Sequence, residues 1–242
     1  MSETGHFEST VNLDPAERDK FNALALTWWD PEGDSRPLHE MNPARIRYIA
    51  ERTNLKGADV TDVGCGGGIL SEALAHRGAE VTGIDIAEKA LMVARLHLEE
   101  SGQKVTYINI TAEQYANENP AESDVVTCLE MLEHVPEPDA VVNACARMLR
   151  PGGHLFLSTL NRTPLAFGVA IVGAEHLLRL LPRGTHRYDR FIRPSEISKS
   201  LRSAGLEVMD VRGIHYNPLS RSTRLGGHLG VNYLVHAMRP DS

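Results

Sequence analysis

The sequence has few cysteines, few aromatic residues and no long apolar run. Its 242 residues contain three cysteines, Cys65, Cys128 and Cys145, and no C-x-x-C pair. A disulfide scaffold is therefore not expected. The longest uncharged apolar run, 165–174, is about half of the ~20 residues that a membrane-spanning helix needs. The N-terminal residues lack the basic and apolar regions of a signal peptide. These absences predict a reduced, cytoplasmic protein.

An excess of positive charge is missing as well. The chain has 25 Lys and Arg against 32 Asp and Glu, which gives a formal net charge of −7. Binding to nucleic-acid phosphates needs a basic surface, so a nucleic-acid partner is not expected. Hydrophobic residues make up 42% and charged residues 24%, which is typical of a globular chain with a sizeable core.

Short β-rich runs alternate with stretches of helical periodicity in the middle of the chain. The expected strands are 58–63, 80–85, 105–110, 124–130 and 154–160, and the expected helices between them are 69–77, 87–101 and 140–149. Strands that alternate with helices indicate βαβ units and a parallel sheet covered on both faces. The predicted fold class is a doubly wound α/β sheet of the Rossmann-like type.

The remaining segments are interpreted as additions to this core. Residues 1–54 are expected to form a helical lid, with helices at 15–29 and 42–53, the second capped by Asn42 and started by Pro43. Residues 55–160 form the core, 161–193 an insert, and 194–242 a helix and two strands, 207–213 and 231–238. Those two strands are predicted to complete the mostly parallel sheet as an antiparallel edge hairpin.

The strongest local motif is the glycine loop from Asp62 to Gly68, between the first strand and the next helix. Gly64 and Gly66 allow a ligand to approach the backbone at a helix N-terminus. The spacing of a dinucleotide fingerprint fails, because Ile69 stands where a small residue is needed. A carboxylate at Asp62 would also repel a pyrophosphate, so a positively charged ligand fits better.

S-adenosylmethionine, with an ammonium and a sulfonium, is such a ligand. Asp85, at the end of the second strand, can accept hydrogen bonds from both ribose hydroxyls. The order of loop and acid resembles that of Rossmann-like methyltransferases, and this resemblance implies that Glu113 and Leu129 flank the adenine. The alternative is a tight turn followed by Asp85 as a helix N-cap.

A second cluster, Glu130, Glu133 and His134, follows the fourth strand. On one helical turn these residues would share a face, and they could hold a divalent cation such as Mg²⁺, Mn²⁺ or Zn²⁺. A cation would help to deprotonate a phenol, whose pKa is near ~10. His134 acting alone as a general base is one alternative, and a solvated turn is another.

Several strings outside the glycine loop closely resemble the bacterial ubiquinone-biosynthesis O-methyltransferases. They are Trp28-Trp29-Asp30, Pro37-Leu38-His39, Cys128-x-Glu130-Met131-x-Glu133-His134-Val135, Ser158-Thr159-Leu160-Asn161-Arg162, Pro182-x-Gly184-Thr185-His186 and Gly213-x-His215-Tyr216-Asn217-Pro218. The resemblance implies methylation of polyprenyl catechol and demethylubiquinol intermediates at both O-methylation steps of the pathway. It also implies complexes with other quinone-biosynthesis enzymes, and cofactor contacts by Gly64, Asp85, Leu129 and Arg45. The cationic Arg45 would pair with the methionyl carboxylate; a surface arginine is the alternative.

The insert contains the most apolar stretch, 164–182, which is followed by Arg183, Arg187, Arg190 and Arg193. This pattern predicts a surface element in contact with anionic lipids at the inner membrane, which the substitution Leu177→Glu would disrupt. A core helix over the sheet is the alternative.

Competing functions for the whole protein are methylation of an RNA terminal ribose and a non-catalytic scaffold. His39, His186 and His215 are further candidate bases, each favoured as structural.

Overall fold

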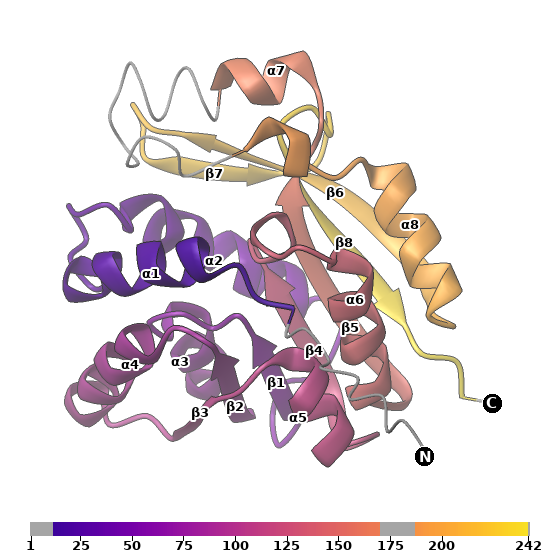
Figure 1. Ribbon diagram of the computed structural model, residues 1–242, viewed down its shortest axis with the longest axis horizontal. Coiled ribbons are helices and arrows are strands. Elements are labelled where there is room, and N and C mark those ends of the chain that lie inside the picture. The colour runs from indigo at the N-terminus through magenta and orange to yellow at the C-terminus, as the bar shows by residue number, and fades with distance from the viewer. Residues whose placement is uncertain (1–11, 170–186, 242) are drawn as a thin grey trace, which may run out of the picture.

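The computed structural model describes residues 12–169 and 187–241, and these residues contain one eight-stranded sheet (Figure 1). The strand order is β3-β2-β1-β4-β5-β8-β6-β7. Neighbours from β3 to β5 are parallel, and β8, β6 and β7 pair antiparallel. The strands are β1 Asp59–Val63, β2 Glu80–Asp85, β3 Val105–Asn109, β4 Ser123–Leu129, β5 Leu149–Leu160, β6 Glu207–Asn217, β7 Ser222–Leu225 and β8 Asn232–Met238. The predicted doubly wound fold is confirmed.

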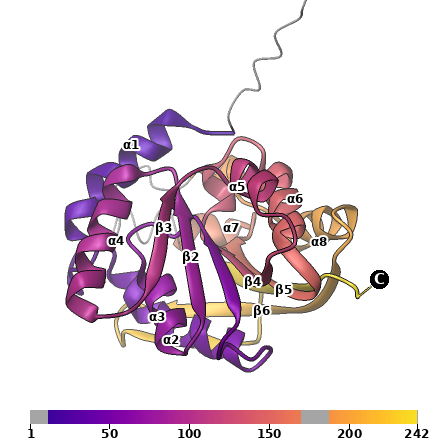
Figure 2. The ribbon, with the colours of Figure 1, turned by 90° about the horizontal axis from the view of Figure 1, so that it is seen from below.

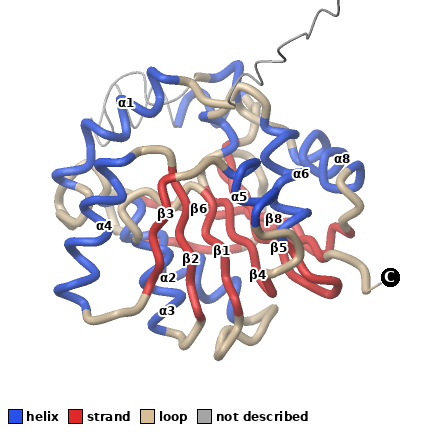
Figure 3. Tube along the Cα trace, turned by 60° about the horizontal axis from the view of Figure 1, so that its bottom comes forward, coloured by secondary structure: helices blue, strands red, loops and turns tan. Residues whose placement is uncertain are grey.

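Helices cover both faces of the parallel strands (Figures 2 and 3). The α-helices are α1 Pro15–Leu24, α2 Arg36–Ala50, α3 Ile69–His76, α4 Glu88–Ser101, α5 Ala112–Glu118, α6 Pro138–Met148, α7 Pro164–Ala166 and α8 Pro194–Ser203. The 3₁₀ helices are η1 Ala25–Thr27, η2 Leu132–His134 and η4 Tyr188–Arg190. Successive side chains of a strand point to opposite faces of the sheet, so neighbouring residues of β4 pack into two different hydrophobic cores. Val125 packs in a cluster with α2 and α3, whereas Val126 packs in a cluster with α5, α6 and α8.

The predicted start of α2 is wrong. The helix begins at Arg36, with Pro37 in its first turn, and continues through Asn42 and Pro43. Asn42 is no N-cap: its buried side-chain Nδ2 donates a hydrogen bond to the backbone oxygen of Ile69, 3.0 Å away. Pro37 already supplies the start that Pro43 was expected to supply. Asn42 instead ties α2 to the first residue of α3.

The C-terminal segment extends the sheet further than an edge hairpin would. β8 lies beside β5 and pairs Leu160 with Asn232, while β6 lies outside β8 and also pairs with β7. The two predicted strands are present. The strand β7 and the helix α5 were not predicted, because four and seven residues give too few repeats for a clear periodic pattern.

The insert is described only in part. It begins with α7, and its residues 170–186, which include Leu177, Arg183 and His186, lie outside the described residues. In the described ranges, no helix has both the length and the apolar character needed to cross a membrane.

Candidate active site

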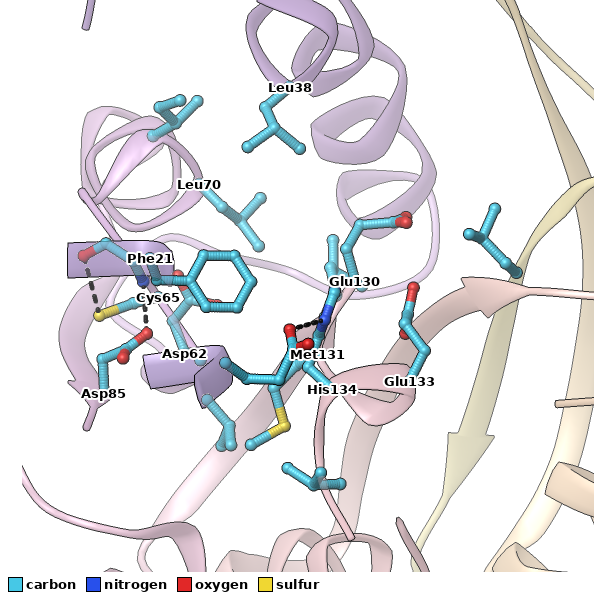
Figure 4. Close-up of a pocket in the computed structure, with 18 of the residues that line it drawn as sticks. Phe21, Leu38, Asp62, Cys65, Leu70, Asp85, Glu130, Met131, Glu133 and His134 are labelled. Atoms are coloured by element: carbon cyan, nitrogen blue, oxygen red, sulfur yellow. Dashed lines mark hydrogen bonds and ion pairs between the residues drawn. The ribbon is translucent and has the colours of Figure 1, made fainter. Parts of the chain in front are cut away.

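A cavity of about 700 Å³ opens at the carboxyl ends of the parallel strands. Its wall contains the ten residues predicted for the cofactor site and the acidic cluster: Arg45, Asp62, Gly64, Gly66, Asp85, Glu113, Leu129, Glu130, Glu133 and His134. Figure 4 shows several of these side chains around one space, together with Phe21 of α1 and Leu38 of α2. The lid helices, the glycine loop and the segment after β4 therefore share one cavity.

Asp85 is placed at the end of β2 by parallel pairing with β1 and β3. Its Oδ2 accepts a hydrogen bond from the Gly66 N–H at 2.8 Å, and its Oδ1 accepts one from the Ala87 N–H at 2.7 Å. Burial raises the pKa of Asp85 above its ordinary value, although these backbone hydrogen bonds oppose the shift. Asp85 thus stabilises the turn before α4, and each of its oxygens retains a second lone pair for a ligand.

The glycine loop is crowded by protein side chains as well as open to a ligand. Gly64 and Gly66 have positive φ values of 71° and 53°. A Cβ atom at Gly66 would lie 2.3 Å from the ring of Trp28, and one at Gly64 would lie 2.6 Å from the side chain of Met131. The sequence explained these glycines by ligand approach alone. The tryptophan pair in the family strings was the signal that could have identified Trp28.

Trp29 fixes the N-terminal segment onto the same loop. Its Nε1–H donates to the backbone oxygen of Gly67 at 2.8 Å, and its ring stacks on His97 with centroids 3.4 Å apart. His97 in turn faces Glu72 of α3 through Nδ1 at 2.9 Å. His39 Nε2 lies 2.9 Å from the Trp28 oxygen, so His39 acts here as a structural residue.

Asp62 lies at the base of the cavity with both oxygens in internal hydrogen bonds. Oδ2 accepts from Ser71 Oγ at 2.6 Å, and Oδ1 accepts from Thr127 Oγ1 at 2.7 Å. Burial raises the pKa of Asp62 to about 6, although the two hydroxyl hydrogen bonds lower it. Its carboxylate therefore links β1, α3 and β4 and also lines the ligand space.

Glu130 is the centre of a polar network directly after β4. Its Oε1 accepts hydrogen bonds from Arg45 Nη2 at 2.9 Å, Ser158 Oγ at 2.6 Å and Asn232 Nδ2 at 3.0 Å. The backbone of Glu130 has a φ of 55°, which is uncommon for a residue with a side chain. The backbone hydrogen bond from the Glu130 N–H to the Ser158 oxygen, 3.1 Å, helps to hold this conformation.

Glu133 is a buried carboxyl group with one oxygen in use. Its Oε2 accepts a hydrogen bond from Thr159 Oγ1 at 2.9 Å, and Glu133 is only 4% exposed. Among the described residues, Oε1 has no hydrogen-bond partner. Burial, followed by the charge of Glu130, raises the pKa of Glu133 to about 8. In its ionised form, Glu133 can therefore accept a proton from a bound group at Oε1.

His134 faces the lid helix. Its Nδ1 lies 2.8 Å from Glu17 Oε2, and its ring meets Phe21 edge-on with centroids 5.0 Å apart. Burial raises the pKa of Glu17, but hydrogen bonds with His134 and Lys20 outweigh this and lower it to about 2. The contact between Glu17 and His134 therefore connects α1 to the segment after β4.

The predicted common face of Glu130, Glu133 and His134 is wrong. Glu130 has a left-handed backbone conformation and precedes a 3₁₀ turn, so the three residues do not follow one α-helical turn. Within 12–169 and 187–241, no group of three or more His, Cys, Asp or Glu residues is placed to hold a metal ion. In this arrangement Glu130 Oε1 pairs with Arg45, and His134 Nδ1 pairs with Glu17.

Four residues of the cavity wall carry a buried polar atom without a partner among the described residues. The atoms are Asn42 Oδ1, Arg45 Nε, Glu133 Oε1 and Asn232 Oδ1. Each belongs to a residue that is at most 9% exposed. A buried polar group without a partner costs about 1–3 kcal/mol, so these positions indicate where a polar ligand or water binds. Asn42 and Asn232 were missed from the sequence.

The other predicted contacts differ in how far they are already occupied. Glu113 Oε1 accepts a hydrogen bond from Asn12 Nδ2 at 2.8 Å, so the segment before α1 competes for this carboxylate. Leu129 is buried at the end of β4 and offers an apolar contact. His215 Nε2 lies 2.8 Å from the Gly226 oxygen, which makes His215 part of the β6–β7 connection.

The fold and the cavity define the class of Rossmann-like methyltransferases. The methyltransferase domain family matches residues 61–157. The magnesium protoporphyrin IX methyltransferase of Synechocystis PCC 6803, solved with bound SAH, superposes with a TM-score of 0.70 at 23% identity. The superposition covers 93% of this chain and 98% of that one. A protein with the same fold therefore binds SAH in a known structure.

Curated relatives give the particular family. The ubiquinone biosynthesis O-methyltransferase of Pseudomonas paraeruginosa is 58% identical over 228 residues, 94% of this chain and 98% of that protein. The protein of the same name from Bordetella avium is 57% identical over 226 residues, 93% of this chain and 94% of that protein. The chain belongs to the ubiquinone biosynthesis O-methyltransferase family.

Proposed function

We propose that this enzyme transfers the methyl group of S-adenosylmethionine to phenolic hydroxyls of polyprenyl catechol and demethylubiquinol intermediates. It acts at both O-methylation steps of ubiquinone biosynthesis. The observation that carries the proposal is the single cavity, which joins the glycine loop and Asp85 to a group of unpartnered polar atoms. The family of the curated relatives supports this assignment.

The cofactor end of the cavity consists of the glycine loop, Asp85 and Leu129. S-adenosylmethionine supplies a methyl group on a positively charged sulfur. Asp85 accepts hydrogen bonds from the ribose hydroxyls, because each of its oxygens can accept a second bond. Leu129 packs against the adenine, and Glu113 lies at the same end. Arg45 Nε binds the methionyl carboxylate, since Arg45 Nη2 is bound to Glu130.

The acceptor end needs a base and an aligned oxygen. Glu133 Oε1 takes the proton of the phenolic hydroxyl, whose pKa is near ~10 before binding. The phenolate oxygen then forms the new bond to the methyl carbon, the carbon–sulfur bond breaks, and its electron pair stays on sulfur. The cavity wall holds both partners in line for this displacement. His134 is the alternative base through Nε2, because Glu17 engages its Nδ1 and so orients the ring.

An apolar rim fits a polyprenyl tail and a membrane surface. Leu165, Phe167 and Val169 are 52%, 43% and 48% exposed, and Val169 also lines the cavity. Exposed apolar side chains next to a substrate entrance favour contact with lipid. We infer a cytoplasmic enzyme attached peripherally to anionic lipids of the inner membrane, where it can meet the other quinone-biosynthesis enzymes.

Product formation tests the proposed function. The purified protein is incubated with S-adenosylmethionine and a catechol carrying a short prenyl chain, and the products are followed by mass spectrometry. We expect the mono-methyl ether and one equivalent of S-adenosylhomocysteine. Binding of S-adenosylmethionine by calorimetry without turnover of any catechol would favour the scaffold alternative. Methylation of an RNA terminal ribose in a parallel reaction would favour the RNA alternative.

A further inference from the structure

We propose that Asn232 positions the aromatic substrate, with its side-chain Oδ1 accepting a hydrogen bond from the hydroxyl next to the one that is methylated. This inference rests on the proposed function and deepens it. It makes Asn232 a determinant of specificity for a ring with two adjacent hydroxyl groups. The residue lies outside the segment 61–157 that matches the general methyltransferase family.

Asn232 reaches the cavity from the antiparallel part of the sheet. It is the first residue of β8, paired with Leu160 of β5 on one side and Ile214 of β6 on the other. The residue is 8% exposed, and it lines the cavity together with both of these neighbours. Pairing on both sides fixes its backbone, so its side chain has a defined direction.

The chemistry of Glu130 determines which way the Asn232 amide is turned. One terminal atom of this amide lies 3.0 Å and 3.1 Å from the two Glu130 oxygens. An ionised carboxylate only accepts hydrogen bonds, so this atom must be the NH₂ group. Arg45, a permanent cation, forms an ion pair with the same carboxylate at 2.9 Å. The other terminal atom of Asn232 is therefore the carbonyl Oδ1.

The carbonyl Oδ1 lacks the donor that would satisfy it. It is buried and has no hydrogen-bond partner among the described residues. When Glu133 is ionised, its Oε1 is a second acceptor in the same wall without a partner among the described residues. A ring with two adjacent hydroxyls brings two donors, one for each of these acceptors. A ring with a single hydroxyl would leave one of them unsatisfied, and buried acceptors without partners are costly.

The experiment compares two substrates and two variants. The substrates are a short-chain prenyl catechol and the matched prenyl phenol that lacks the second hydroxyl. In Asn232→Ala the unpartnered carbonyl and one donor to Glu130 are removed. In the control, Ser158→Ala, another donor to Glu130 is removed, but no unpartnered acceptor is lost. Calorimetry with S-adenosylmethionine verifies that each variant is folded.

We expect the wild-type enzyme to prefer the catechol in kcat/KM, with a higher KM for the phenol. Asn232→Ala should lose about tenfold of this preference, which is the effect of one hydrogen bond, through a raised KM for the catechol. Ser158→Ala should keep the preference even if both rates fall. An unchanged preference in Asn232→Ala, or equal losses in the two variants, would overturn the role of Asn232.

The wild-type enzyme provides a test that does not depend on folding of a variant. If it methylates the phenol and the catechol with equal kcat/KM, the proposed role of Asn232 is wrong while the O-methyltransferase assignment stands. If it methylates neither ring, the proposed function fails, and the inference fails with it.

Discussion

The parallel and antiparallel parts of the sheet contribute to the cavity in different ways. Asp62 lies next to the last residue of β1, Asp85 is the last residue of β2, and Glu130 directly follows β4, so the parallel part delivers carboxylates to one edge. The antiparallel part delivers Ile214 and Asn232 to the same cavity. Together with the lid helices, it closes the side that the parallel strands leave open.

The two parts of the sheet are expected to serve different tasks: binding of the cofactor and choice of the acceptor. The parallel part largely coincides with the matched segment 61–157, and a methyltransferase at 23% identity shares the fold. The C-terminal strands and the lid lie outside that segment. The parallel edge is therefore expected to govern binding of the cofactor, and the added elements are expected to govern which acceptor is methylated.

The largest expected effect comes from Glu133, the proposed proton acceptor. Glu133→Gln removes the proton acceptor while keeping the shape of the side chain, so kcat should fall about a thousandfold. Affinity for S-adenosylmethionine, measured by calorimetry, should stay within about twofold. The matched control is Glu118→Gln on the exposed surface of α5. A Glu133→Gln enzyme with nearly full kcat would exclude this carboxyl group as the base.

A smaller effect, confined to the cofactor, is expected from Asp85→Asn. The amide NH₂ would face one of the backbone N–H groups of Gly66 and Ala87, and two charge-assisted hydrogen bonds to the ribose would weaken. We expect about a hundredfold weaker binding of S-adenosylmethionine by calorimetry. Glu80→Gln, at the exposed start of the same strand, is the control. Equal affinities in wild type and Asp85→Asn would contradict the assignment.

The membrane face offers the next test of the comparison. Phe167→Glu places a charge on the apolar rim beside the cavity and should weaken binding to anionic vesicles about tenfold in sedimentation assays. Leu96→Glu changes a more exposed apolar residue on α4, at the opposite end of the molecule (Figure 1). It should bind vesicles like wild type. If the two variants bind equally, the rim is not the lipid contact.

The smallest effect concerns the junction of β5 and β8. His154 Nδ1 lies 2.9 Å from His236 Nε2, and the His236 ring stacks on Phe156. Burial lowers the pKa of His154 and lowers that of His236 to about 4 from 6.5. The unfolded chain therefore binds more protons between pH 4 and 6.5. The free energy of unfolding should fall as the pH falls through this window.

Urea unfolding at pH 7 and pH 5 measures this loss. We expect the wild-type protein to lose about 1–2 kcal/mol at this junction, and His236→Phe, which cannot be protonated there, to lose less. His76→Phe, a histidine change in the last turn of α3, should lose as much as wild type. The same loss in all three proteins would show that the histidine pair does not control the pH dependence.

The sequence predicted the parallel strands to within a few residues, except at the start of β5. β2 was predicted with the bounds it has, because Val81 and Ile84 are buried and turn residues flank the run. β5 begins at Leu149 instead of 154, since the Pro151-Gly152 turn pairs back onto the sheet. Local patterns identify such strands because each is a short run rich in apolar residues, and a glycine or proline lies a few residues before it.

Ten residues that line the cavity were predicted from the sequence, but their hydrogen-bond partners were not. These ten residues line the cavity, yet Glu130, Glu133 and His134 do not lie on the single helical turn that was predicted for them. Two of their partners, Glu17 for His134 and Asn232 for Glu130, are more than 100 residues away in the chain. No local spacing reports such contacts.

By itself, the sequence determined the doubly wound fold, the glycine loop and the acids at the strand ends, because periodicity, turn residues and short-range order specify them. Only the tertiary structure decided which oxygens are satisfied. Trp28 fills the space above Gly66, Arg45 neutralises Glu130, and Asn232 leaves its carbonyl without a donor. These features depend on contacts between distant segments, and their energies are set by burial, which exists only once the chain has folded.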